Sequence, residues 1–225
     1  DGMTKVNIAA YPDGHVYNDF CASWLFMYLV YFLTYPIDLG AGKASLALLS
    51  GQIADGIATN VVGIFIDKTN TRIGKKKPWY IIGFALVLPS FILTFNTWAL
   101  CDIVCGQDND KCSDTGYETV ESIYYLTLPA LFNIGWAAVQ IATMSVVVSM
   151  TLSNGRRDVL VSMRNGFTYV ANLLTLIFAI FYILIIDDPI TIFRSLAYTL
   201  TAIGMFTSLF FIFWVPEVKL QKDAL

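Results

Sequence analysis

The sequence predicts an all-α membrane protein that crosses the bilayer six times. Of its 225 residues, 56% are hydrophobic and only 14% are charged, whereas soluble domains carry about 25% charged residues. Six stretches reach the roughly 20 apolar residues that a membrane span needs. They lack period-2 alternation and are too long for barrel strands, so we expect helices. This composition excludes a secreted disulfide mini-domain and a disordered chain, and the net charge of −3 argues against a nucleic-acid binder.

The predicted spans cover about residues 16–35, 45–66, 79–100, 123–152, 167–186 and 193–215. Residues 1–15 are expected to form an N-terminal segment before this bundle of residues 16–215, and residues 216–225 a tail. The first segment lacks the apolar stretch of a cleavable signal peptide. Because the chain begins with Asp1 rather than Met, we expect that an N-terminal piece is missing.

The basic residues predict the orientation of the bundle, because Lys and Arg accumulate on the cytoplasmic side of membranes. Eleven of the 14 fall on one side: Lys5, Lys68, Arg72, Lys75, Lys76, Lys77, Arg156, Arg157, Arg164, Lys219 and Lys222. The other side holds Lys43, Lys111 and Arg194, together with a run of acidic residues. We therefore expect both termini in the cytosol.

Three of the four cysteines, Cys101, Cys105 and Cys112, lie in the loop predicted on the acidic side. An oxidising compartment there would allow one disulfide among them, and free thiols are the alternative. The C-x3-C spacing is unusual for zinc and His is absent from this loop, so we expect no metal site.

A polar stripe runs along the second span, where Gln52, Asp55 and Thr59 share one helical face. A charge at membrane depth costs at least about 2.5–3.5 kcal/mol and commonly marks a functional site. Asp55 is therefore the candidate for exchanging a proton or binding Na⁺ inside a water-filled cavity. The alternative is a hydrogen bond that joins two helices.

A second group of polar residues is spread over three other spans. Asp19 is placed near the cytosolic start of the first span, where contact with a solute competes with a simple interfacial or capping role. The polar faces of spans four and five consist of Asn133, Trp136 and Gln140 and of Asn165, Tyr169 and Asn172. We expect these faces to line a common cavity, and we expect His15 to be solvated at the interface.

The loop between spans two and three carries a motif. The segment from Gly63 to Trp79 resembles the signature loop of the major facilitator superfamily, in its sequence and in its position on the cytosolic side. The matching residues are Gly63, Asp67, Arg72, Gly74, Lys75 and Lys76. The resemblance implies the N-terminal six-helix half of a twelve-helix fold, built as a 3+3 inverted repeat.

The residues of this loop also suggest a gate on physical grounds. Gly63 would let two helices approach closely, and Asp67 could pair with Arg72 or face the N-terminus of a helix in another bundle. Making and breaking that contact would bias one conformation over another. The alternative is a basic loop that only sets the topology.

Two further resemblances narrow the family. The segments Tyr17–Phe20 and Gly51–Gly63 resemble melibiose-type cation–sugar symporters, in which the acids matching Asp19 and Asp55 serve the sugar and the cation, respectively. Here Thr59 and Gln140 stand where that family has further acids. The segments Gln52–Gly56, Gly135–Ile141 and Arg164–Asn172, with Cys101-x3-Cys105, look closer to the animal branch that imports cysteine into lysosomes and melanosomes.

The resemblance implies secondary active transport of a small polar solute, either an amino acid such as cysteine or a sugar-like molecule, coupled to H⁺ or Na⁺. We expect Asp55 to be the coupling carboxylate, Asp19 and Gln140 to contact the solute, and the bundle to rock against a C-terminal half. That half would belong to the same polypeptide or to another chain, in an endolysosomal or vacuolar membrane. The alternative is a half-transporter retained as a structural subunit of a larger membrane complex.

We do not expect an enzyme, because the sequence lacks a Ser/His/Asp set, a metal cluster and a phosphate-binding glycine loop. Apart from a coupling ion, no cofactor is expected. The expected partners are membrane lipid, the solute and the second half of the transporter.

Overall fold

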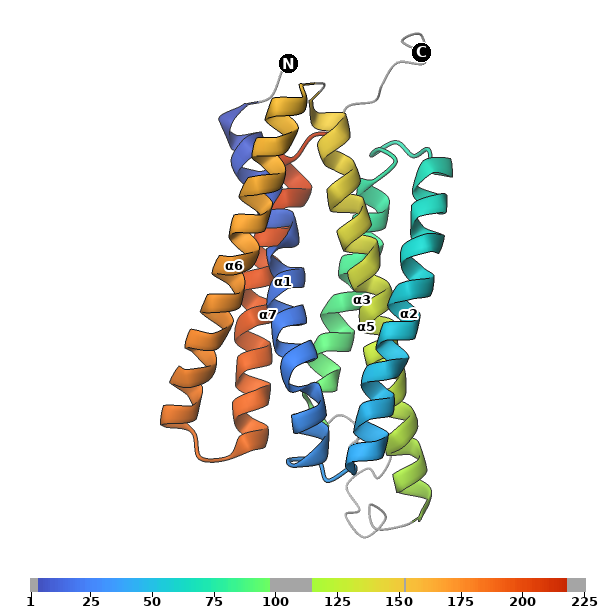
Figure 1. The fold of residues 1–225 in the computed structure, drawn as a ribbon, viewed down its shortest axis with the longest axis vertical. Helices are drawn as coiled ribbons and strands as arrows, with labels where there is room; N and C mark the ends of the chain where they lie inside the picture. Colours follow the sequence, from blue (N-terminus) through green and yellow to red (C-terminus); the bar gives the residue numbers. More distant parts are fainter. Residues whose placement is uncertain (1–3, 98–114, 152, 218–225) are drawn as a thin grey trace.

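A computed structural model describes residues 4–97, 115–151 and 153–217. Six helices make up this part of the chain (Figure 1): α1 Lys5–Thr34, α2 Ala41–Lys68, α3 Lys77–Thr94, α5 Thr115–Met150, α6 Asn154–Ile185 and α7 Pro189–Trp214. All six are long and apolar enough to cross a membrane. The predicted all-α, six-span fold is therefore confirmed.

Two helices begin well before the predicted spans. α1 starts at Lys5 rather than near residue 16, because Thr4 and Asn7 form a reciprocal capping box that satisfies the free N–H groups of the first turn. α6 starts at Asn154 rather than near residue 167. Hydropathy marks only the apolar part of a helix, so polar first turns escape it. Asp19 consequently lies midway along α1, about 21 Å from the helix start, and not near that start as predicted.

The packing of the helices has the symmetry of two repeats of three. α1 packs mainly against α7 and α6, and α5 packs mainly against α3 and α2. Exchanging the triplet α1–α2–α3 with the triplet α5–α6–α7 maps these pairs onto each other. Because each triplet crosses the membrane an odd number of times, the second starts from the opposite side and is inverted. This arrangement agrees with the expected 3+3 inverted repeat and leaves α2 and α6 on opposite flanks of the bundle (Figure 1).

An aromatic cluster holds the bundle together near the end of α1. Phe193 of α7 packs against Trp24 and Phe32 of α1, with ring centroids 4.7 and 4.8 Å apart, and Phe32 contacts Phe95 at 5.1 Å. Such ring pairs contribute about 0.5–1.5 kcal/mol each beyond burial. The cluster fixes α1 against α7 and against the end of α3, so the middle of α1 is held in place.

α3 and α5 approach each other closely at a point where a glycine of each helix faces the other. On α3, a Cβ at Gly83 would lie 2.7 Å from the carbonyl oxygen of Gly135 on α5, and a Cβ at Gly135 would meet the Gly83 carbonyl at the same distance. Small residues that let backbones approach in this way are a common basis of helix packing in membranes. A methyl group at either position must push the two helices apart.

We predict that Gly83→Ala lowers the free energy of unfolding by about 1–3 kcal/mol, since the overpacked backbone contact has no flexible side chain to yield. Thermal unfolding of the purified protein in detergent measures the effect. Gly63→Ala is the matched control, because a Cβ there meets nothing within 4 Å. Equal melting temperatures for the two variants would show that the α3–α5 contact is not tight.

Candidate functional site

A buried polar network joins the middle of α1 to α6. The His15 Nδ1 atom lies 2.9 Å from Asp19 Oδ1, and an Arg164 Nη atom lies 3.2 Å from His15 Nε2. Thr168 donates its hydroxyl to Asp19 Oδ2 at 2.9 Å. The exposed fractions of Asp19 and Arg164 are 7% and 8%. An acid and a base are thus buried together, with a histidine ring between them.

The partners of His15 determine where its proton lies. Arg164 can only donate hydrogen bonds, so the ring atom that it meets, Nε2, must accept. Nδ1 then carries the proton and donates it to the Asp19 carboxylate, which also accepts from Thr168. The geometry therefore assigns a neutral ring with its hydrogen on Nδ1. Asp19 and Arg164 compensate each other's charge through this ring.

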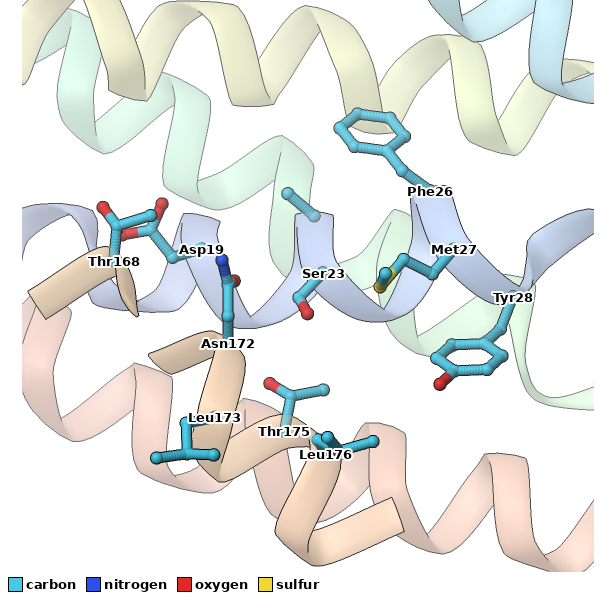
Figure 2. A pocket seen from close by; sticks show the side chains of 11 residues that line it. Asp19, Ser23, Phe26, Met27, Tyr28, Thr168, Asn172, Leu173, Thr175 and Leu176 are labelled. Atoms are coloured by element: carbon cyan, nitrogen blue, oxygen red, sulfur yellow. The ribbon is translucent and has the colours of Figure 1, made fainter. Parts of the chain in front are cut away.

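Two cavities open on either side of Asp19. One, of about 590 Å³, lies between α1 and α6 and is lined by Asp19, Ser23, Thr168, Asn172 and Thr175 together with apolar side chains. Figure 2 shows the α1 and α6 side chains facing each other across this space. The other, of about 300 Å³, lies between α1, α5 and α6. Its lining consists of His15, Asp19, Trp136, Gln140, Arg164, Asn165, Thr168 and Tyr169.

Three polar atoms on residues around the smaller cavity are buried without a hydrogen-bond partner. They are Arg164 Nε, Trp136 Nε1 and Gln140 Oε1. An unpaired buried polar atom costs about 1–3 kcal/mol, so native proteins retain few of them. Two donors and one acceptor close to a carboxylate suit a small polar solute, because its own polar groups would complete these bonds.

The structure brings together four of the predicted site residues. Asp19, Trp136, Gln140 and Asn172 line the two cavities. His15 was expected at the solvated interface, and this expectation is wrong, because its side chain is 2% exposed. The signal was present in the sequence, since His15 precedes Asp19 by one helical turn and shares its face.

Arg164 is the second residue that sequence reasoning misplaced. It was assigned to a basic cytosolic loop, but it lies inside α6 and faces α1. Its place one turn before Thr168 gave it the same helical face as the predicted polar residues of span five. An arginine that is buried and paired inside a membrane helix is expected to be functional.

The polar stripe of α2 lies apart from this network. Thr59 donates to Asp55 at 3.3 Å, Asp55 and Thr59 are half-buried, and Gln52 is exposed. None of the three lines either of the cavities that Asp19 shares. The stripe instead belongs to a helix that is largely uncovered by the described bundle. The role of Asp55 as the coupling carboxylate stays a prediction.

The loop after α2 is held by a residue from the other end of the chain. The Glu217 carboxylate accepts the backbone N–H groups of Lys75 at 2.7 Å, Lys76 at 3.0 Å and Lys77 at 3.0 Å. This places a negative charge at the N-terminus of α3, where the helix dipole favours it.

Gly74 makes this contact feasible. Its φ of +124° disfavours side chains, and a Cβ there would collide with the Glu217 carboxylate.

Burial lowers the pKa of Lys76, while the Glu217 and Asp67 carboxylates oppose that shift. The Lys76 ammonium also donates to Ser149 of α5 at 3.1 Å. The loop is thereby tied to α3, α5 and the end of α7.

The other predicted gate residues make fewer contacts. Asp67 and Arg72 are both exposed and, within the described residues, do not form an ion pair. The close helix approach expected at Gly63 is not made within the described bundle. The predicted disulfide residues Cys101, Cys105 and Cys112 lie outside the described residues.

An inverted-repeat helical bundle with a buried acid–base network beside cavities at the middle of its helices defines the half-bundle of a membrane carrier. The comparisons agree with this class. The family model described as MFS/sugar transport protein matches residues 14–219. The chain therefore belongs to this family of major facilitator transporters.

Several curated relatives support the assignment. Major facilitator superfamily domain-containing protein 12 of mouse is 34% identical over 161 residues, which cover 71% of this chain and 32% of the relative. A protein named an uncharacterized symporter from Synechocystis is 27% identical over 176 residues, covering 78% of this chain and 30% of the relative. The glucuronide carrier protein homolog of Escherichia coli is 32% identical over 95 residues, which cover 42% of this chain and 20% of the relative. The chain thus spans about a third or less of the length of these relatives.

We predict that Gly74→Ala lowers the free energy of unfolding by about 1–3 kcal/mol, because the new methyl group is strained at positive φ and displaces Glu217. Gly155→Ala is the control, since a Cβ there meets nothing within 4 Å. When Glu217 is replaced by alanine, Gly74→Ala should lower the free energy of unfolding by less. The methyl group then no longer collides with the Glu217 carboxylate, and only the backbone strain remains. Strictly additive effects in this double-mutant cycle would contradict the contact.

Proposed function

We propose that the chain forms half of a secondary active transporter for a small polar solute, coupled to H⁺ or Na⁺. The observation that carries the proposal is the His15–Asp19–Arg164 network beside two cavities in the middle of the bundle. A buried ionic network costs stability unless every group is paired. Its position next to unpaired polar atoms suits a site that exchanges partners with a solute. The symporter named among the relatives supports coupling to an ion.

The solute site lies between α1, α5 and α6. Asp19 would accept hydrogen bonds from the solute, Gln140 and Trp136 would supply the unpaired acceptor and donor, and Asn172 would border the wider cavity. The finer identity of the solute, an amino acid such as cysteine or a sugar-like molecule, follows from the resemblance of the sequence. The carboxylate and amide groups present suit the ammonium of the first and the hydroxyls of the second.

Transport would require a second half-bundle. α2 and α6 flank the bundle and expose rows of apolar side chains, among them Ile53 and Ile57 on α2 and Leu173 and Leu176 on α6. A second bundle would cover part of these faces and would close the cavities from the other side. Rocking of the two halves would then expose the site alternately, with the loop held by Glu217 on one side of the membrane.

The cellular setting of this proposal follows from charge. α1 begins and α7 ends at the same end of the bundle (Figure 1), and the basic loop after α2 lies at that end. By the positive-inside rule, this arrangement supports a cytosolic location for both termini. The resemblance to the cysteine-importing branch favours an endolysosomal or vacuolar membrane over the plasma membrane.

The test uses the full-length protein in proteoliposomes with imposed H⁺ or Na⁺ gradients. We predict concentrative uptake of labelled L-cysteine, methyl glucuronide or methyl glucoside, lost by at least tenfold in Asp19→Asn, because the variant amide cannot replace the buried charge that Arg164 compensates. Asp55→Asn measured alongside reports whether the α2 stripe contributes to coupling.

Glu118→Gln is the control variant, since this residue lies on the first turn of α5, away from the network. Full concentrative uptake by Asp19→Asn would refute the assignment of the site. Absence of uptake by the wild-type protein for every probe, together with stable co-purification of other membrane proteins, would favour the structural subunit instead.

A further inference from the structure

His15 holds Arg164 only while its ring is neutral. Nδ1 carries the hydrogen that points to Asp19, and the Nε2 lone pair accepts from Arg164 at 3.2 Å. A second proton can bind this ring only at Nε2, which is the atom that Arg164 occupies. Binding of a proton and contact with Arg164 are therefore mutually exclusive at this atom.

Protonation would also change the charge of the network. Asp19 and Arg164 sum to zero with a neutral ring, whereas an imidazolium brings the three residues to +1. Two cations would then face each other at hydrogen-bond distance in a buried site, with donors on both sides. Like charges in a site of low dielectric repel strongly, so the guanidinium must leave the ring.

We propose that His15 binds the transported proton and thereby releases Arg164 to bind an anionic group of the solute. This inference rests on the proposed transport function and names its coupling ion and the class of solute group that the ion accompanies. The proton comes from water on the acidic side and binds the Nε2 lone pair. Arg164 then turns from the ring to a carboxylate, and both steps reverse when the solute leaves.

The surroundings of Arg164 give the guanidinium a place to go. It borders the 300 Å³ cavity, and its Nε atom is buried without a partner. Among the described residues that line this cavity, Asp19 is the one carboxylate, and it is already paired with His15 and Thr168. An incoming anion is therefore the group that would satisfy a released guanidinium.

The remaining neighbours leave the charge balance of the network unchanged. α5 contributes Trp136 and Gln140, which do not titrate, and α6 contributes the phenol of Tyr169. Tyr11 on α1 lies within electrostatic range of Arg164. Towards α7 and α3, the side-chain hydrogen bonds of this part of α1 are the Tyr17–Thr201 hydroxyl pair and the Tyr80 hydroxyl donated to the Gly14 carbonyl. Asp13, two residues before His15 on α1, is a further acid nearby, but it lines neither cavity. The basic and acidic groups that hydrogen bonds join in the switch are thus His15, Asp19 and Arg164.

The net charge of the site determines how the binding of the proton and the binding of the solute are coupled. A proton adds +1 to the network and a carboxylate adds −1, so the loaded site has the same net charge as the empty one. Each ligand bound alone leaves an uncompensated charge in a buried site. Binding of the two is therefore cooperative, and by linkage each raises the affinity of the other by the same factor. A solute without an anionic group would gain nothing from the proton.

The first test needs no solute. In full-length protein with ¹⁵N-labelled histidine and arginine, the His15 signal is assigned by its loss in His15→Gln. Magnetic-resonance spectra should show a neutral ring with the hydrogen on Nδ1 and a through-space contact from Nε2 to Arg164. On acidification this contact should vanish as the ring takes its second proton. A hydrogen on Nε2 in the neutral ring, or a contact that persists with the imidazolium, would overturn the proposal.

The second test measures protons released or taken up with the solute. In weakly buffered solution, wild-type protein should take up about one proton per bound methyl glucuronide, which is a net anion, and none with methyl glucoside, which lacks the carboxylate. His15→Gln keeps a donor and an acceptor but cannot bind a proton, so it should bind methyl glucuronide with no proton uptake and at least tenfold more weakly at acidic pH. Unchanged proton uptake in this variant would overturn the proposal.

The two proposals fail in different ways. If wild-type protein neither binds nor transports any of the three probes, the proposed function fails, and the spectra still decide whether protonation separates His15 from Arg164. If the probes are transported but uptake in His15→Gln responds to the pH gradient as in wild type, the transport function stands and the role of His15 falls.

Discussion

The cost of placing charge inside a membrane protein governs the arrangement of this bundle. Asp19 and Arg164 are both more than nine-tenths buried on helices that pack side by side. Either charge alone would be strongly unfavourable there. His15 bridges the two charges and Thr168 donates a further hydrogen bond to Asp19, so α1 and α6 must keep their relative rotation and depth for the network to persist. The cavities on both sides of Asp19 follow from that fixed register.

The inverted repeat explains why this network lies where it does. α1 and α5 are the central members of their triplets, and each packs against two helices of the other triplet. Side chains near the middle of α1 are consequently covered by α6 and α7, whereas the flanking α2 and α6 keep one face uncovered. The candidate site is thus buried on the side of its own bundle and bordered by α6, which still has a free face. This is the geometry expected where two halves of a carrier meet.

Much of the fold could be predicted from the sequence because hydropathy reports the apolar middle of each helix directly. The polar ends could not be predicted in this way. Thr4 caps α1 far before its apolar part, so Asp19 and His15 were assigned to the interface. Arg164 was counted as a loop residue because charge alone cannot show that α1 supplies it with a partner. Glu217 needed the tertiary structure, since its contacts are with backbone N–H groups that have no signature in sequence.

The partly uncovered polar stripe of α2 and the greater length of the relatives point to the same conclusion. Asp55 is only half-buried, and its described hydrogen bond comes from Thr59 on its own helix. A carboxylate facing lipid at this depth would cost at least about 2.5–3.5 kcal/mol, and the exposed amide of Gln52 on the same face would add to that cost. The relatives are about three times as long as the matched region or longer. A second bundle laid over α2 would remove that cost by enclosing the stripe in an aqueous or polar interior. Asp55 would then lie between the two halves, and the His15 network would lie within one half.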